Sequence, residues 1–255
     1  MNITNLFGLR SKKQLDQPDG VYMGIECEIE SVFLRDGQAF RDFQITTDNS
    51  LRNHGIEFIS VPLKPPRLLE SFRRLHREIE YEDHNCAFTP RTSTHIHLNC
   101  RHMEELAVRQ MLYLYALFEK YFFLMVDPAR IDNIHCVPLS QTVLHQRYNQ
   151  ALADIVYTWH KYTAFNLLPL RTQGSVEFRH LHGTDDAVLL ERWLSCIVNL
   201  QELACKQPIT RETLCDRGCL VEWLGFVFVN SPHLLKLDMD SLVYDELLEL
   251  KMTFM

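Results

Sequence analysis

The stretch GIECEIE, residues 24–30, alternates carboxylates with apolar residues. Successive side chains of a β-strand point to opposite faces, so the acids would share one face and the apolar residues the other. Carboxylates this close repel one another, and each raises the pKa of its neighbour unless a cation lies among them. The stretch therefore predicts a strand with one buried face and one acidic face that needs a positively charged partner. The acids are Glu26, Glu28 and Glu30, and the apolar residues are Ile25, Cys27 and Ile29.

The composition is that of a folded protein with a substantial core. The chain has 255 residues, 46% of them hydrophobic, and a formal net charge of −7 at pH 7. This length is enough for one large or two small domains. The negative charge argues against nonspecific binding to nucleic acid or to an anionic membrane, and we expect neither as a partner.

The sequence predicts a reduced, cytoplasmic protein. Its eight cysteines are scattered, and no charged start followed by an apolar run indicates a secretory signal. The most apolar segment, residues 111–126, contains Glu119 and Lys120 and is shorter than the roughly 20 residues needed to span a bilayer. Cys215 and Cys219 lack the matching second pair that a zinc site requires, so we predict no metal there.

Hydrophobic periodicity predicts strands before and between three helices. We expect the segment 37–46 to form a hairpin with the first strand, across a turn at Asp36 and Gly37, and the last long helix to be capped by Thr184 or Asp185, with two acids in its first turn. The predicted strands span residues 21–34, 37–46, 55–63, 93–100 and 174–182, and the predicted helices span 67–84, 103–126 and 184–205.

Because strands and helices do not alternate regularly, an α+β fold is favoured over a doubly wound parallel sheet. We expect a mainly antiparallel sheet with helices packed on one face and the other face free for chemistry. Residues 1–20 are polar and turn-rich and predict a loose lead-in, residues 21–204 a catalytic domain, and residues 205–255 a mainly helical extension of the same domain.

Other strands repeat the arrangement of the opening stretch. In THIHL, His95 and His97 share one face, and in SVEFR, Glu177 and Arg179 do the same. If the apolar faces rest on helices, these groups gather with the acids of the first strand and with Glu57. An oxygen-rich site with one or two imidazoles suits Mg²⁺ or Mn²⁺ better than zinc.

Each motif alone has an ordinary structural explanation, such as a solvated strand face or a pair of packed histidines. The order of the motifs fits neither a metal hydrolase barrel, which takes its H-x-H from an early strand, nor a cupin, which expects a Glu shortly after it. The chain also lacks the glycine-rich phosphate loop G-x-x-x-x-G-K-[ST]. Any nucleotide would therefore be held by metals and basic side chains.

Four separated motifs occur in a fixed order over roughly residues 20–200. They are GIECEIE, TDNSLRNHGIEFISVPL, THIHL and FNLLPLRTQGSVEFRHLHGT. In this order they resemble the amidoligase family (type 2 carboxylate-amine ligases), distant relatives of glutamine synthetase and glutamate-cysteine ligase. The resemblance implies a curved antiparallel sheet, like the glutamine synthetase catalytic domain, whose concave face binds ATP and divalent metals.

The resemblance also implies roles for individual residues. Glu26 and Glu28 would divide between two metal sites, His95 and Glu177 would complete the second, and Glu57 would be a further ligand or a substrate contact. His97 would face the nucleotide phosphates, and Arg179 the transferring phosphoryl group. Asp48 would lie on the substrate or ammonium side, and Asn166 is a lesser match in the FNL step. Lys161, where related sequences often have arginine, is a candidate phosphate contact. Glu30 lies outside the two-acid pattern, and its role stays open between structural and supporting.

The resemblance implies ATP-dependent amide bond formation between a carboxylate and an amine through an acyl phosphate, with ATP and Mg²⁺ or Mn²⁺. Asp48 or Glu57 could accept the proton of the amine. Two alternatives stay open: a phosphotransferase on the same fold, and a non-catalytic nucleotide- or metal-binding module. The sequence does not tell which small-molecule or peptide amine and carboxylate are used. The stretch YTWHKYTAF (157–165) and the loop after Pro138 are candidates for the acceptor pocket or for core.

Overall fold

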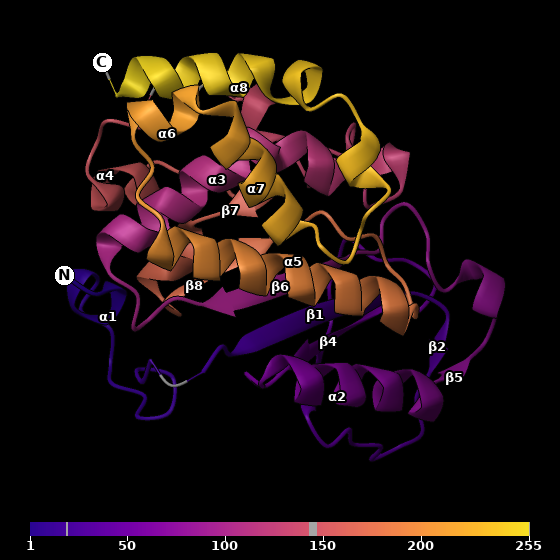
Figure 1. Ribbon diagram of the computed structural model, residues 1–255. Helices are drawn as coiled ribbons and strands as arrows, with labels where there is room; N and C mark the ends of the chain where they lie inside the picture. The colour runs from indigo at the N-terminus through magenta and orange to yellow at the C-terminus, as the bar shows by residue number, and fades with distance from the viewer. Residues whose placement is uncertain (19, 143–146, 255) are drawn as a thin grey trace.

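The computed structural model describes residues 1–18, 20–142 and 147–254 and has an α+β fold (Figure 1). An antiparallel six-stranded sheet has the order β3-β4-β1-β6-β8-β7, and a separate two-stranded sheet pairs β2 with β5. The strands are β1 Met23–Ile29, β2 Val32–Phe33, β3 Phe43–Thr46, β4 Ile56–Ser60, β5 Glu80–Tyr81, β6 Thr94–Asn99, β7 Phe165–Asn166 and β8 Ser175–Phe178.

The helices lie on the apolar side of the sheet. The apolar residues of β1, which alternate with its acids, are buried in the main core together with side chains of α2, α3 and α5. In Figure 1, α2 and α5 lie across the sheet, and α3 and α8 stack beyond α5. The helices are α1 Ile3–Leu6, α2 Pro65–Glu78, α3 Glu105–Phe123, α4 Leu152–Tyr157, α5 Ala187–Lys206, α6 Arg211–Cys215, α7 Arg217–Val227 and α8 Met239–Thr253. Short 3₁₀-helices are η1 His84–Cys86, η2 Pro128–Arg130, η3 Leu139–Gln141, η5 Leu168–Arg171 and η6 Leu234–Lys236.

The first predicted strand, 21–34, is interrupted, and its predicted hairpin is wrong. Ser31 has φ 55°, a left-handed conformation that ends β1 and turns the chain into β2. The segment around β3 pairs with β4, and β1 instead pairs with β4 and β6. The turn at Asp36 and Gly37 is present, but it leads to a connection and not to a hairpin with β1. Sequence signals for a turn do not tell which strand the following segment joins.

The predicted start of the last long helix is also wrong by one or two residues. Asp186 is the N-cap of α5, and its Oδ1 accepts hydrogen bonds from the backbone N–H groups of Val188 and Leu189. Thr184 and Asp185 therefore precede the cap, and the first turn of α5 contains no acid. The Asp186 carboxylate at the N-cap satisfies two N–H groups that would otherwise be unpaired.

The segment predicted as a loose lead-in contacts the rest of the fold at Ile3 and Asp16, while residues 10–14 are exposed. Ile3 is fully buried, and its N–H donates to the carbonyl of Met103 at 3.0 Å. Farther along, Asp16 accepts a hydrogen bond from Arg101 Nε at 2.6 Å. The described C-terminal part is mainly helical, and its apolar side chains join the same core cluster as the sheet.

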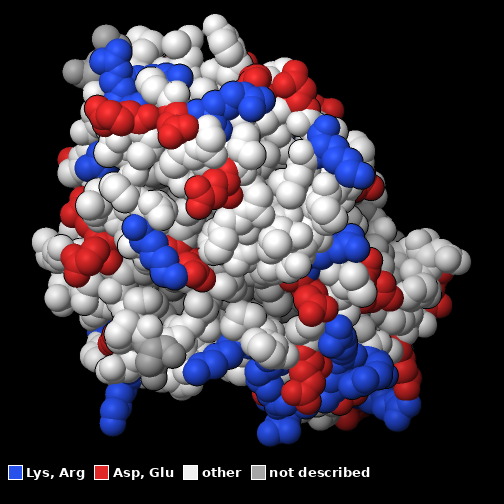
Figure 2. All heavy atoms as spheres, viewed as in Figure 1, with Lys and Arg blue, Asp and Glu red and all other residues white. Residues whose placement is uncertain are grey.

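The face shown in Figure 2 carries side chains of both charges. Lys and Arg side chains gather over α2, at the lower edge of the view, with acidic side chains among them. Arg67 pairs with Glu70, and Arg73 with Glu191. Such exposed pairs contribute little to stability. Within the described residues, no helix is long and apolar enough to cross a membrane, and all eight cysteines are free thiols.

Candidate functional site

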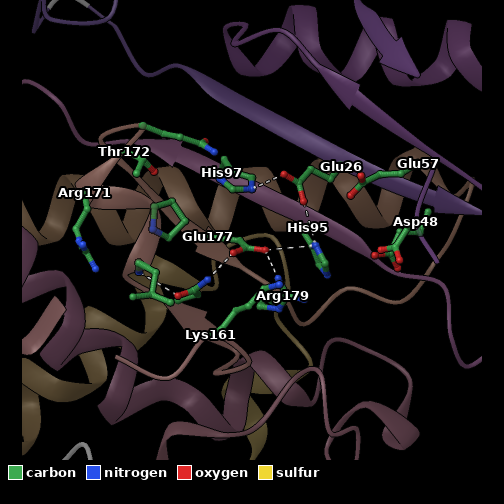
Figure 3. A pocket seen from close by; sticks show the side chains of 15 residues that line it. Glu26, Asp48, Glu57, His95, His97, Lys161, Arg171, Thr172, Glu177 and Arg179 are labelled. Carbon is green, nitrogen blue, oxygen red and sulfur yellow. Dashed lines mark hydrogen bonds and ion pairs between the residues drawn. The ribbon is translucent and has the colours of Figure 1, made fainter. Parts of the chain in front are cut away.

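A cavity of about 530 Å³ opens on the sheet face that the helices leave free (Figure 3). Every residue that the sequence and the resemblance single out for chemistry lines it. The strands β1, β4, β6, β7 and β8 supply most of these side chains, and three come from connections. The predicted residues are Glu26, Glu28, Asp48, Glu57, His95, His97, Lys161, Asn166, Glu177 and Arg179.

Strand register brings these residues together. Glu26 lies opposite His95, and Glu28 lies opposite Glu57 on the other neighbouring strand. His97 lies opposite Glu177 in turn. Directly opposed residues of antiparallel strands have their side chains on the same face and close to one another. The alternation in the sequence therefore becomes a patch of acids and imidazoles.

Glu26, His95 and Glu177 form the first cluster, with one candidate ligand atom from each within 4.8 Å of the others. His95 Nδ1 lies 3.3 Å from Glu26 Oε2 and 3.3 Å from Glu177 Oε1. His97 Nε2 lies 3.1 Å from the other oxygen of Glu26. Imidazole rings therefore border Glu26 on two sides, as the dashed lines in Figure 3 show.

The first cluster is charge-compensated. Asn166 donates to Glu177 Oε2 at 2.6 Å, and Arg179 donates to Glu177 Oε1. Burial opposes ionisation of Glu26, but hydrogen bonds from His95 and His97 outweigh it and lower the pKa of Glu26 below its usual range. For Glu177, burial is likewise outweighed by the charges of His95, His97 and Arg179, and its pKa is lowered.

Glu28, Asp48 and Glu57 form the second cluster, also with candidate ligand atoms within 4.8 Å of one another. Here no described residue donates a hydrogen bond to Glu57. Burial first, and then the charges of Glu26 and Glu28, raise the pKa of Glu57 to about 7. The second cluster holds negative charge without a cation, which is the situation that a divalent ion relieves.

Ser93 links the two clusters and was not predicted. Its hydroxyl lies 2.6 Å from Glu28 Oε2 and 2.8 Å from His95 Nε2. A carboxylate can only accept, so Ser93 donates to Glu28 and accepts from the Nε2–H of His95. His95 Nδ1 is thereby directed toward Glu26 and Glu177. Ser93 precedes His95 and His97 at the same two-residue spacing, and that spacing could have identified it.

Glu30, the third acid of the opening stretch, lies outside this cavity and is fully buried. It accepts from Arg91 Nε at 3.0 Å and Nη2 at 3.1 Å, and from the backbone N–H of Arg52 at 2.7 Å. Burial raises its pKa, but hydrogen bonds from Arg91 and Arg52 outweigh this and lower it. Glu30 therefore has its cationic partner inside the protein and supports the loops around the site.

The segment around η5 also lines the cavity and was missed, apart from its place within the last motif. Its side chains form the wall beyond Glu177, where Arg171 stacks 4.3 Å from the ring centre of Tyr157. No periodic or charge signal marks this wall, because it is an irregular connection. The lining residues are Leu168, Pro169, Arg171, Thr172 and Gln173.

The aromatic stretch 157–165 divides between core and site. Trp159 and Phe165 are buried in the main core. Lys161 is exposed, lines the cavity, and holds its ammonium 5.4 Å from the ring centre of Tyr162. In the loop after Pro138, residues 143–146 lie outside the described residues.

The donor set fits hard divalent cations. Five of the six cluster members are carboxylates and one is an imidazole. Mg²⁺ and Mn²⁺ prefer such oxygen-rich sets, whereas structural zinc favours Cys and His. His95 donates its Nε2–H to Ser93, which leaves Nδ1 to face the carboxylates. Histidines that bind a metal through one ring nitrogen commonly donate the other N–H to such a partner, which fixes the ring orientation. A scan against protein-family models found no match for this chain, and a search of curated proteins found none either.

Proposed function

We propose that this protein is an ATP-dependent carboxylate-amine ligase that forms an amide through an acyl phosphate. One observation carries the proposal: two carboxylate clusters lie side by side in one open cavity, with the guanidinium of Arg179 beside the first. The motif order that resembles amidoligases is the second support. An antiparallel sheet with helices on one face and the site on the other is compatible with the glutamine synthetase-like fold that the resemblance implies.

Phosphoryl transfer needs neutralisation of charge and in-line placement more than covalent help from the protein. Glu26, His95 and Glu177 would hold one divalent ion, and Glu28, Asp48 and Glu57 the other. Bound Mg²⁺ or Mn²⁺ would offset the charge of the triphosphate and of the acid row. Arg179 and His97 lie beside the first cluster and would contact the phosphate oxygens.

In the first step, an oxygen of the substrate carboxylate attacks the γ-phosphorus of ATP. An O–P bond forms, the bond to the β-phosphate oxygen breaks, and ADP leaves. In the second step, the amine nitrogen attacks the acyl carbon, a C–N bond forms, and inorganic phosphate leaves with the C–O electron pair. The cavity residues position both substrates, so that the reacting groups meet without loss of the acyl phosphate to water.

The amine loses a proton during the second step. Asp48 and Glu57 lie on the same side of the cavity and are the carboxylates available for it.

The test is phosphate release from ATP in the presence of Mg²⁺ or Mn²⁺ with panels of acids and amines. The proposal predicts ADP and phosphate in equal amounts, with turnover that requires both an acid and an amine, and an amide as product. A stable phosphorylated compound formed without amine would instead identify a phosphotransferase. Nucleotide binding by calorimetry without phosphate release across the panels would identify a binding module.

A further inference from the structure

A second, smaller cavity of about 160 Å³ adjoins the main one at the Glu28 end of β1. The two cavities share Glu28, Asp48, Lys161 and Arg179 in their walls. We use the name acceptor chamber for this smaller cavity. Its other lining residues are Ser50, Arg91, Ser93, Arg130, Asn133, His135 and Tyr162.

Four cationic side chains and two carboxylates line the acceptor chamber. Arg91 is paired with Glu30, and Arg179 with Glu177. Arg130 and Lys161, in contrast, form no ion pair with any described residue. The two carboxylates, Glu28 and Asp48, belong to the second metal cluster.

Arg130 is the more informative of the two unpaired cations. It is buried, with 4% of its surface exposed. Its Nε donates to the carbonyl of His180 at 2.9 Å and its Nη2 to the carbonyl of Arg179 at 2.6 Å, and neither is an acid. A buried charge without a counter-ion is costly, and an anionic ligand in the chamber would offset that cost. Lys161, an exposed residue that lines both cavities, offers a second cation.

The opposite end of the sheet face differs in character. A cavity of about 420 Å³ there adjoins the main one at Glu26 and His97, and it is lined mostly by uncharged residues, among them Gly24, Ile59 and Pro62. Alternate residues of β1 thus line three adjoining cavities in sequence. Gly24 lines the mostly uncharged cavity, Glu26 lines that cavity and the main one, and Glu28 lines the main cavity and the acceptor chamber. Among these three cavities, the chamber has the most Lys and Arg side chains in its walls.

We propose that the acceptor chamber binds the carboxylate substrate, and that this substrate is a compact acid with a second anionic group. This inference rests on the proposed ligase function. The carboxylate to be activated would face Glu28 and Asp48, where the divalent ion binds, while the second anionic group would contact Arg130 and Lys161. The volume lies below the roughly 300 Å³ at which pockets for drug-sized ligands begin, which favours an acid of a few carbons over a peptide.

The experiment compares glutarate with butyrate, which lacks only the second carboxylate. Calorimetry with the Mn²⁺-loaded full chain measures binding of each acid to the wild type, to Lys161→Gln and to Lys236→Gln, which removes one exposed charge at η6. We expect glutarate to bind at least about tenfold more tightly than butyrate, and Lys161→Gln to remove about tenfold of that affinity. Lys236→Gln should bind both acids as the wild type does.

Equal binding of glutarate and butyrate, no binding of glutarate, or binding unaffected by Lys161→Gln would overturn the inference. These results are independent of nucleotide turnover. If the protein discriminates the two acids through Lys161 but releases no phosphate from ATP, the selective chamber stands and the proposed ligase function is refuted. If the protein ligates butyrate and glutarate equally well, the ligase function stands and the selective chamber is refuted.

Discussion

The two carboxylate clusters lie on the same sheet face but differ in how their charge is balanced. In the first, imidazoles and the guanidinium of Arg179 lie among the acids, and the pKa values of Glu26 and Glu177 are lowered. In the second, Ser93 and a backbone N–H of Ser50 are the donors to Glu28 and Asp48, and the pKa of Glu57 is raised to about 7. Neighbouring side chains thus compensate the charge of the first cluster, whereas no described cation pairs with the carboxylates of the second.

This difference teaches that glutamates at alternate positions of one strand can have their charge compensated by neighbouring side chains or left uncompensated. Position in the strand does not decide which. The neighbours across the register do: Glu26 faces His95, and Glu28 faces Glu57. The predictions below test whether the two clusters behave as differently as their surroundings imply.

The largest expected effect is on turnover. Glu177→Gln and Glu28→Gln, one change in each cluster, should each lower kcat for amine-dependent phosphate release by about 10²–10³-fold, because each removes a carboxylate that would hold a divalent ion beside the reacting phosphates. Steady-state assays with saturating Mg²⁺ measure it. Glu202→Gln, at an exposed acid of α5, is the control and should leave kcat unchanged. Wild-type turnover in either cluster variant would remove that cluster from the mechanism.

The second effect is on stability without metal. Glu177→Gln leaves Arg179 without its buried ion-pair partner and His95 with Glu26 alone, and should lower the free energy of unfolding by about 3 kcal/mol. Glu57→Gln removes repulsion and should raise it by about 1 kcal/mol. Urea denaturation in the presence of a chelator measures both. Destabilisation of similar size in the two variants would show that the clusters do not differ in their need for a cation.

A smaller effect is expected at the link between the clusters. Ser93→Ala removes the hydroxyl that fixes His95 Nε2 and donates to Glu28. Because such supporting hydrogen bonds orient ligands, Mn²⁺ affinity should fall by about tenfold without loss of fold. Calorimetric titration with Mn²⁺ measures it, and Ser241→Ala, in the first turn of α8, is the control. Unchanged Mn²⁺ affinity in Ser93→Ala would show that Ser93 has no part in directing His95.

The smallest expected effect is on the pH dependence of stability. Since the pKa of Glu57 rises from 4.5 to about 7 on folding, the metal-free protein should lose stability as pH rises through this window, on the order of 1 kcal/mol after solvent screening. Glu57→Gln should remove that loss. Glu26 acts in the opposite sense, because its lowered pKa contributes stability that is lost as pH falls below 4.5. Unfolding curves between pH 4 and 8 measure both.

Glu246 on α8 provides the control for this experiment. Burial, and then the charge of Glu119, raise the pKa of Glu246 to about 7 as well, far from the cavity in the sequence and in the fold. Glu246→Gln should therefore flatten the same pH window, but should leave Mn²⁺ affinity unchanged. A Glu57→Gln variant with the pH profile of the wild type would contradict the picture of an uncompensated second cluster.

Sequence alternation predicted the faces of the strands and therefore the site. The period of two in GIECEIE and THIHL correctly placed Glu26, Glu28, His95 and His97 on the face away from the core, because the pleat of a strand leaves little freedom. Ser93 obeys the same period and was overlooked. The residues outside strands, such as Asp48, were assigned through resemblance to a family.

The alternation of residues could not predict which strands pair with one another or where each strand ends. The break at Ser31 depends on one left-handed residue, and the partner of β3 depends on contacts distant in sequence. The basic lining of the acceptor chamber, with Arg91 and Arg130, comes from connections that fold over the sheet. Neither residue carries a periodic signal, since irregular segments are positioned by tertiary contacts.

The most direct measurement is anomalous diffraction from crystals of the protein soaked with Mn²⁺ and a non-hydrolysable ATP analogue. The account predicts two manganese peaks per chain, one among Glu26, His95 and Glu177 and the other among Glu28, Asp48 and Glu57, with the triphosphate across them. Manganese bound elsewhere, or a triphosphate held away from both clusters, would contradict it.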